Sequence, residues 1–215
     1  MAKLCTVFLI IFSFHVSGES VSKNIIGSFS TGNLDAWETI KFQSETTYRL
    51  VENESAMVLL SNSEASASGL INKQKIDLQK YPFLNWRWQA NKKLSPMNEQ
   101  TKTGDDYVAR MYVVVSDGWF FWNTKVLNYV WSSQAIKGTS WPNAYAPDNA
   151  KMIALRTSHH EAGTWYAEKR NVYKDFKQWL GKDIELIEAI AIMTDSDDSA
   201  SSASAMYGDI YFSRD

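Results

Sequence analysis

Cysteine is nearly absent from this sequence, which limits the chemistry open to the protein. The single cysteine is Cys5, close to the N-terminus. Without a second thiol, no disulfide can form within the chain, and zinc sites built from cysteine ligands are excluded. A protein without disulfides must be stabilised by its core, and 215 residues are enough to bury one.

The net charge is small, and histidines and long apolar runs are scarce. The formal net charge is −2, which gives no electrostatic case for binding nucleic acid or an anionic membrane. The chain holds three histidines and four prolines. It has no Gly-x-Ser-x-Gly nucleophile elbow and no phosphate-binding glycine loop. After residue 18, no apolar segment approaches the length that spans a bilayer, so no transmembrane segment is expected there.

Residues 1–18 have the order of a secretory signal peptide. Lys3 comes first, an apolar run covers residues 4–14, and small residues follow at positions 16–18. The run is too short for a permanent membrane anchor. The alternative is an N-terminal core strand or helix. We expect the protein to be exported, to the periplasm or beyond, with residues 19–215 forming a single domain.

Many short segments rich in β-branched and aromatic residues predict an all-β protein. The clearest covers residues 107–115. The other expected strands are 37–42, 47–50, 56–61, 69–76, 83–89, 125–131, 151–157, 164–171, 187–194 and 205–212.

One segment, residues 172–181, has the spacing of a short helix. Tyr173, Phe176 and Leu180 fall on one stripe, and Gly181 is a natural stop. One helix among about ten short strands favours a jelly-roll-like two-sheet β-sandwich. A parallel α/β fold would need helices between most of the strands.

Polar residues occur inside strands that otherwise have a buried pattern. Because residues i and i+2 of a strand share a face, Arg110 and Tyr112 are expected on the same side of their strand. Planar rings and fixed polar groups are what a sugar-binding face needs, and a guanidinium pairs well with a carboxylate, so the arginines could select acidic sugars. The candidate ligand-binding residues are Arg87, Arg110, Tyr112, Asn128, Trp131, Arg156, Glu168 and Arg170.

The same pattern has a second interpretation, which the sequence leaves open. An exposed sheet face also alternates polar and apolar residues, and the arginines could only form ion pairs with neighbouring acids. Aromatic residues at 119–122 and 141–145 raise a similar choice. They either lie exposed at loop tips, where they contact a sugar or a partner protein, or fold back to cover the ends of the sandwich.

Acidic residues near the C-terminus suggest a cation site. Asp195, Asp197 and Asp209 are the candidate metal ligands, and the hard oxygen donors would suit a structural Ca²⁺. An EF-hand is excluded because Ala200 stands where glycine is required and Met206 where the closing glutamate belongs. The alternative is a solvated acidic loop.

Catalytic patterns are weak. Beyond the signal segment, the histidines are the adjacent His159 and His160. One of them, with Tyr112 and Arg110, could form a base, an acid and a charge neutraliser for a polysaccharide lyase. A third hypothesis is a non-catalytic envelope assembly protein that uses the aromatic loop at 119–122.

The motifs that carry these residues resemble those of a bacterial family of exported proteins known only as a domain of unknown function. The resemblance implies a secreted β-sandwich and supplies no activity. The matching motifs are ASGL at 67–70, LNWRW at 84–88, DDYVAR at 105–110, LNYVW at 127–131, EKRNV at 168–172, AIMTD at 191–195 and YGDI at 207–210.

A looser likeness concerns the two ends of the domain. Residues 29–37 and 208–210 are similar to the ends of jelly-roll carbohydrate-binding modules, in which the first and last strands often share a structural calcium. We therefore expect a β-sandwich that binds a glycan or another polyhydroxylated ligand, with the lyase and the assembly protein as alternatives.

Overall fold

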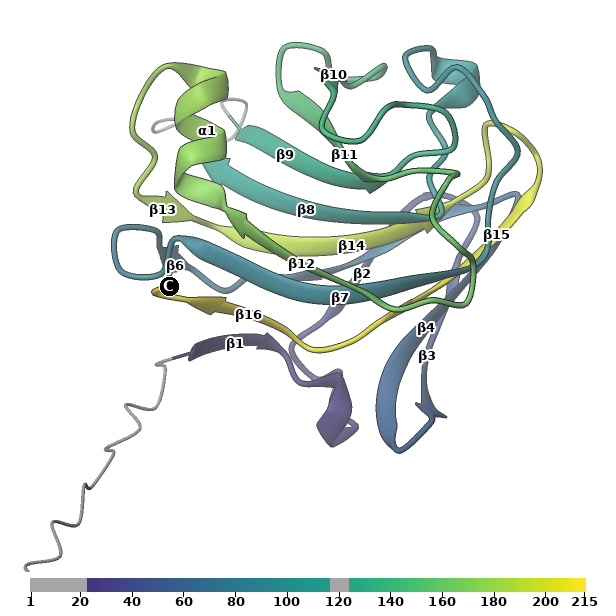
Figure 1. Cartoon of the computed structure of the whole chain (residues 1–215), viewed down its shortest axis with the longest axis horizontal. Helices are drawn as coiled ribbons and strands as arrows, with labels where there is room; N and C mark the ends of the chain where they lie inside the picture. The colour runs from purple at the N-terminus through teal and green to yellow at the C-terminus, as the bar shows by residue number, and fades with distance from the viewer. Residues whose placement is uncertain (1–22, 117–123) are drawn as a thin grey trace, which may run out of the picture.

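Two curled sheets packed face to face form the protein (Figure 1). The computed structural model describes residues 23–116 and 124–215, which contain sixteen strands, one α-helix and two short 3-10 helices. The signal segment 1–18 and the aromatic loop 119–122 lie outside the described residues.

The first sheet, called sheet A here, has seven strands. Strand β7 is paired with β12 on one edge and with β15 and β16 in succession on the other. The strands are β1 (Lys23–Gly27), β16 (Ile210–Ser213), β7 (Phe83–Lys92), β15 (Ser202–Tyr207), β4 (Ala56–Glu64) and β3 (Thr47–Asn53) in this order, with β12 (Tyr166–Asn171) beside β7.

The second sheet, sheet B, also has seven strands. Strands β11 and β9 are parallel, and the other described pairs are antiparallel. The order is β10 (Ser140–Pro142), β11 (Ala150–Arg156), β9 (Thr124–Trp131), β8 (Ala109–Ser116), β14 (Ala189–Asp195), β5 (Ala67–Asn72) and β2 (Glu38–Gln43). Strands β6 (Ile76–Asp77) and β13 (Leu186–Ile187) pair separately, and the 3-10 helices are η1 (Phe29–Thr31) and η2 (Lys102–Gly104).

Strand alternation builds the core between the sheets. On β8, Met111, Val113 and Val115 are fully buried and face inward. Trp88 of sheet A packs against Trp131 of sheet B, with ring centroids 6.0 Å apart. Because these positions point into the core, their neighbours along each strand point to the outer faces.

Helix α1 (Val172–Leu180) closes one end of the sandwich (Figure 1). Its buried residues are Val172 and Phe176. The Asn171 side chain caps the helix by accepting a hydrogen bond from the Lys174 amide at 2.9 Å. Gly181 ends the helix in the left-handed conformation at φ 69°, as expected of a C-terminal glycine.

The predicted all-β, two-sheet, jelly-roll-like sandwich with one short helix near 172–181 is confirmed. Several boundaries differ from the prediction, and the strands expected at 47–50, 56–61 and 83–89 extend three residues further. The strand expected at 205–212 is interrupted by Gly208 and Asp209, so that β15 and β16 are separate strands. The strand expected at 69–76 likewise ends at Asn72. The short strands β1, β10 and β13 were not predicted, because strands of two to five residues depend on their partners for pairing.

The cap of α1 gives a test of the fold. Replacing Asn171 with alanine leaves the Lys174 amide without its acceptor, so we expect Asn171→Ala to lower the free energy of unfolding by about 1 kcal/mol. Urea denaturation followed by circular dichroism measures the change. The control is Gln178→Ala, because Gln178 is exposed on the same helix and should change the stability by less than about 0.5 kcal/mol. Equal stabilities for wild type and Asn171→Ala would contradict the cap.

Candidate functional site

A cavity of about 540 Å³ opens on the outer face of sheet B. We call it the sheet B pocket. One row of its floor runs across four neighbouring strands, where Ile71 pairs with Ala191, Ala191 with Tyr112 and Tyr112 with Asn128. Gly69 lies in the next row, where an added Cβ would approach the Ile192 carbonyl oxygen to 2.8 Å. The small residues Gly69 and Ala191 therefore leave space above this part of the sheet.

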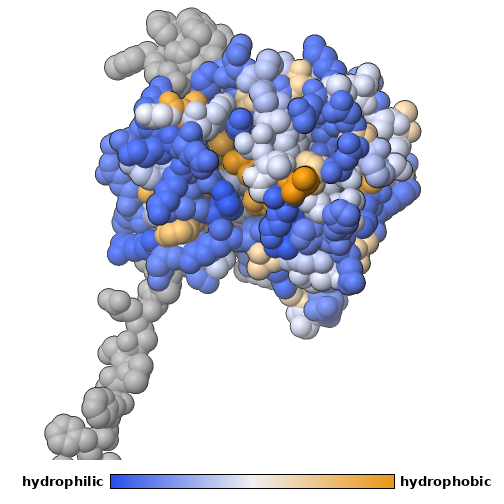
Figure 2. Space-filling model, turned by 45° about the horizontal axis from the view of Figure 1, so that its top comes forward, coloured by the Kyte–Doolittle hydropathy of each residue, from blue (hydrophilic) through white to orange (hydrophobic). Residues whose placement is uncertain are grey.

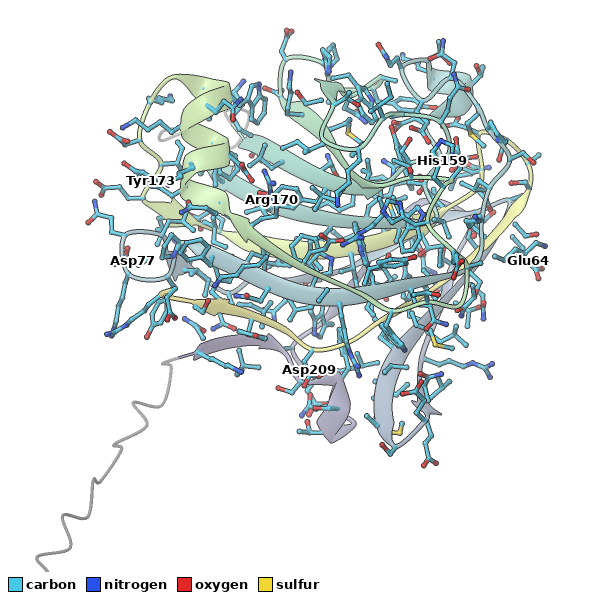
Figure 3. All side chains as sticks on the ribbon, viewed as in Figure 1. Glu64, Asp77, His159, Arg170, Tyr173 and Asp209 are labelled. Atoms are coloured by element: carbon cyan, nitrogen blue, oxygen red, sulfur yellow. The ribbon has the colours of Figure 1, made fainter. Side chains whose placement is uncertain are left out.

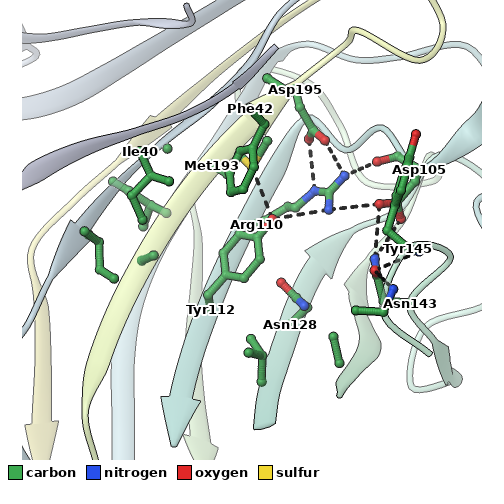
Figure 4. Close-up of a pocket in the computed structure, with 18 of the residues that line it drawn as sticks. Ile40, Phe42, Asp105, Arg110, Tyr112, Asn128, Asn143, Tyr145, Met193 and Asp195 are labelled. Carbon is green, nitrogen blue, oxygen red and sulfur yellow. Dashed lines mark hydrogen bonds and ion pairs between the residues drawn. The ribbon is translucent and has the colours of Figure 1, made fainter. Parts of the chain in front are cut away.

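Two exposed aromatic residues line the sides of the pocket. Phe42 on β2 is 68% exposed and Tyr145, in the loop before β11, is 55% exposed. The pairing of β2 with β5 shifts between Lys41 and Gln43, and such an irregularity re-aims a side chain. Both rings are exposed rather than covered by the core (Figure 4), and the Lys102 ammonium lies 5.3 Å from the centroid of the Tyr145 ring.

Asn143 shapes the loop that carries Tyr145. Its Oδ1 accepts the amides of Tyr145 and Ala146, both at 3.0 Å. Its Nδ2 donates to both carboxylate oxygens of Asp105, at 3.2 and 3.1 Å. The loop is thereby fixed to the polar end of the pocket.

Arg110 organises that polar end (Figure 4). Its Nε and Nη2 donate to the two carboxylate oxygens of Asp195. Its Nη2 also donates to the Asp105 carbonyl oxygen, and its Nη1 to the Asp105 carboxylate at 3.4 Å and the Tyr112 hydroxyl at 3.2 Å. The guanidinium lies 4.2 Å from the ring centroid of Tyr107.

Although burial opposes it, the negative charge of Asp195 raises the pKa of Arg110 above its ordinary value. The guanidinium therefore stays charged inside the protein, where Arg110 is only 4% exposed.

Acidic side chains outnumber basic ones at this end of the pocket. Asp105, Asp106 and Asp195 are all buried, and Asp106 accepts the amides of Asp198 and Ser199 at 3.2 and 2.7 Å. Carboxylate oxygens of Asp106, Asp195 and Asp197 lie within 4.8 Å of one another, so this cluster could hold a metal ion. Burial and then the charges of Asp198 and Asp106 raise the pKa of Asp197, while burial and the charges of Asp106 and Asp105 raise that of Asp198.

Asn128 is buried in the same pocket without a full set of partners. It is 1% exposed, and within the described residues its Oδ1 accepts no hydrogen bond. Figure 4 shows its side chain among the pocket residues, near Tyr112. An unpaired buried carbonyl costs about 1–3 kcal/mol, which a donor in a bound ligand would recover.

The structure brings together three of the eight candidate ligand-binding residues, namely Arg110, Tyr112 and Asn128. Trp131 lies instead in the core, 1% exposed, and its indole N–H donates to the Thr157 carbonyl. Its inward direction follows from its position on β9, since Leu127 and Tyr129 face inward too.

The other candidates lie apart from the pocket. Arg156 forms an ion pair with Glu168, which also accepts the indole N–H of Trp88 at 3.0 Å. Arg170 forms two hydrogen bonds to Asp175 of α1, at 3.0 and 2.6 Å. These two pairs match the alternative interpretation, in which strand arginines bind neighbouring acids.

Arg87 lies on the outer face of sheet A. Its guanidinium stacks 4.6 Å from the Trp165 ring centroid, and within the described residues it forms no salt bridge. It lines a second cavity of about 460 Å³ together with Glu168 and Asp209. Because it points away from sheet B, the expected single face of arginines is not formed.

The three candidate metal ligands are also divided. Asp195 and Asp197 lie in the acidic cluster, joined by Asp106. Asp209 lies elsewhere, and its carboxylate accepts the Ser30 amide at 2.8 Å and the Ser30 hydroxyl at 2.5 Å. It thus links η1 to the turn before β16 by hydrogen bonds. Figure 3 shows Asp209, Arg170 and His159 in three separate parts of the molecule.

The arrangement proposed for a lyase is not assembled. Neither His159 nor His160 lines the pocket that holds Arg110 and Tyr112. The His160 ring packs against Tyr166 and Trp131, with centroids 5.1 and 6.1 Å apart, and its Nδ1 accepts the Thr157 amide. Burial and Arg156 lower the pKa of His160, as suits a neutral structural side chain.

Sequence reasoning missed several pocket residues. Phe42 ends a predicted strand, where its exposure could not be read from alternation. Asp105 and Asp106 precede a strand as adjacent acids, a signal that could have joined them to Asp195. In the loop 141–145, Trp141 is buried, as the interpretation that these aromatics cover the end of the sandwich expects, whereas Tyr145 is exposed.

Residues 35–211 match the family described as Protein of unknown function (DUF3047), and the chain belongs to this family. No curated protein matches the sequence. Among the described residues, no helix is long and apolar enough to cross a membrane.

Solved structures share the fold. The chain is similar to "Cellulose induced protein, Cip1", with 10% identity and a TM-score of 0.51 over 87% of this chain and 96% of that one. It is also similar to the carbohydrate recognition domain of Emp47p, with 12% identity and a TM-score of 0.46 over 93% and 99%. A third is TmCBM61, solved in complex with β-1,4-galactotriose, with 11% identity and a TM-score of 0.43 over 90% and 100%. At these identities the likeness concerns the fold.

The Arg110 network predicts a large effect on stability. Arg110→Leu leaves the buried carboxylates of Asp105 and Asp195 without their counter-charge, so we expect the free energy of unfolding to fall by about 3–5 kcal/mol. The control is Arg87→Leu, because Arg87 is exposed and should cost less than about 1 kcal/mol. Chemical denaturation measures both. Similar losses in the two variants would contradict the central position of Arg110.

The raised pKa of Asp197 predicts a pH dependence. The folded state binds this proton more tightly than the unfolded state, so ionisation of Asp197 reduces stability as the pH rises above about 3.9, the ordinary Asp value. We expect Asp197→Asn to melt at a higher temperature than wild type at pH 7, with the difference vanishing toward pH 4. Asp148→Asn, at an exposed aspartate outside the pocket, is the control. A difference that does not depend on pH would refute the electrostatic cause.

Proposed function

We propose that this protein is an exported β-sandwich domain, spanning residues 19–215, that binds a glycan in the sheet B pocket. The observation that carries the proposal is the pair of exposed rings, Phe42 and Tyr145, that wall a cavity of about 540 Å³ with Asn128 unpaired in its lining. Neither His159 nor His160 lines this pocket, which supports binding over the lyase hypothesis for this site.

The pocket combines the two kinds of contact that a sugar needs. Sugar rings have C–H faces that pack on aromatic and aliphatic side chains, here Phe42, Tyr145 and Met193. Their hydroxyls need fixed polar partners, and the Asn128 Oδ1, which is unpaired within the described residues, is such an acceptor. Figure 2 shows one face of the molecule, on which most residues are hydrophilic and hydrophobic residues occur in small patches.

The proposal uses a smaller set of residues than the sequence indicated. Tyr112 and Asn128 contact the ligand, while Arg110 positions Tyr112 and the Asp105–Asn143 pair. Arg156, Glu168 and Arg170 stabilise the scaffold through their ion pairs. A structural Ca²⁺, expected from the sequence, would bind at Asp106, Asp195 and Asp197, since Asp209 is occupied by Ser30.

The aromatic walls give the test of this function. We expect Phe42→Ala and Tyr145→Ala each to weaken oligosaccharide binding about tenfold, which corresponds to about 1.4 kcal/mol. Both residues are exposed, so the melting temperature should stay within a few degrees of wild type. Isothermal titration calorimetry on an array of tetrasaccharides measures the affinity.

The matched control is Ile136→Ala, because Ile136 is 76% exposed and does not line the pocket. It should bind as wild type does. If wild type binds no oligosaccharide, or if Phe42→Ala and Tyr145→Ala bind as tightly as Ile136→Ala, the pocket is not a glycan site.

A further inference from the structure

The charge of the sheet B pocket limits which glycan can enter. The described residues that line it include four aspartates, namely Asp105, Asp195, Asp197 and Asp198, and one cation, Arg110. Among these lining residues, an acidic sugar would have to find its counter-charge on Arg110, whereas the Lys102 ammonium, which is outside the lining, lies 5.3 Å from the Tyr145 ring centroid.

Arg110 has no donor left for such a ligand. A guanidinium carries five N–H groups, one on Nε and two on each Nη nitrogen. Here Nε donates to Asp195, Nη2 to Asp195 and the Asp105 carbonyl oxygen, and Nη1 to Asp105 and Tyr112. An incoming carboxylate would have to displace a buried aspartate that already occupies the fork.

The groups that remain available are acceptors. Asn128 offers the Oδ1 that is unpaired within the described residues. Asp197 is half-buried at the rim, and no hydrogen bond from another described residue to its carboxylate is recorded, whereas Asp198 accepts the Tyr145 hydroxyl at 2.6 Å. A ligand that fits this lining brings hydrogen-bond donors and positive charge.

We infer that the sheet B pocket selects amino sugars, whose ammonium group binds beside Asp197 while the oligosaccharide contacts the aromatic side chains Phe42 and Tyr145, and that it rejects uronic acids. This inference rests on the proposed glycan-binding function and names its substrate class. Asp197 is a specificity residue, and Asn128 is the second acceptor of the same pocket.

A metal ion is the other source of positive charge for these oxygens. Asp197 also belongs to the cluster with Asp106 and Asp195, and calcium prefers carboxylate ligands. An ammonium group and a calcium ion would then compete for Asp197. The test therefore has to separate the two cations.

The experiment measures the affinity of the folded chain for four probes of equal length by calorimetry in EDTA. The probes are tetrasaccharides of glucosamine, N-acetylglucosamine, glucose and galacturonic acid, at a pH at which the amines are protonated. We expect the glucosamine tetramer to bind at least about fivefold more tightly than the glucose tetramer, and the galacturonic acid tetramer not to bind. N-acetylation removes the charge and should remove the preference.

Variants assign the preference to the carboxylate. Asp197→Asn keeps the shape and removes the charge, so it should bind the glucosamine and glucose tetramers equally. Asp197→Glu should keep the preference, and Asp148→Asn, a charge change outside the pocket, should behave as wild type. Calcium in place of EDTA should weaken glucosamine binding to wild type and not to Asp197→Asn.

The outcomes separate this inference from the proposed function. Equal binding of all four probes, or tighter binding of galacturonic acid, overturns the amino-sugar inference and leaves the glycan pocket in place. Calcium binding through Asp197 without any glucosamine binding overturns it in favour of a metal site. No binding of any tetrasaccharide overturns both.

Discussion

The buried guanidinium of Arg110 is the constraint around which the outer face of sheet B is organised. It joins β8 to β14 through Asp195 and to the segment before β8 through Asp105, and Asp105 in turn holds Asn143 and the Tyr145 loop. A buried charge is tolerated only when it is paired and hydrogen-bonded. The same contacts that neutralise Arg110 therefore fix the positions of Tyr112 and the loop that walls the pocket.

This arrangement leaves an excess of acid at the pocket, since one guanidinium serves several carboxylates. Asp106 is held by two backbone amides, while Asp197 stays at the rim with a raised pKa. Unfavourable electrostatics in a folded protein are typical of a binding site, because a ligand of opposite charge relieves them. A hydrogen-bond donor of a ligand would likewise satisfy the Asn128 Oδ1, which has no partner among the described residues.

Sequence reasoning worked where local patterns decide the structure. Alternation placed Arg110 and Tyr112 on the same face of their strand, and the helix at 172–180 ends at Gly181 as its spacing predicted. It could not say that Arg87 and Arg110 lie on different sheets, because alternation defines a face within a strand and not which strands are neighbours. Trp131 shares its face of β9 with Leu127 and Tyr129, so alternation itself indicates the core position that the structure shows.

The sequence by itself determined the fold class, the alternation of faces within the main strands, the helix and its end at Gly181, and the lack of an internal disulfide. These depend on side-chain periodicity and on residues close together in the chain. Only the tertiary structure decided which polar residues meet. Asp105 and Asp195 come from segments far apart in the chain and meet because β8 and β14 are neighbours in sheet B. Phe42, on the edge strand β2, and Tyr145, in the loop between β10 and β11 at the other edge, line the same pocket.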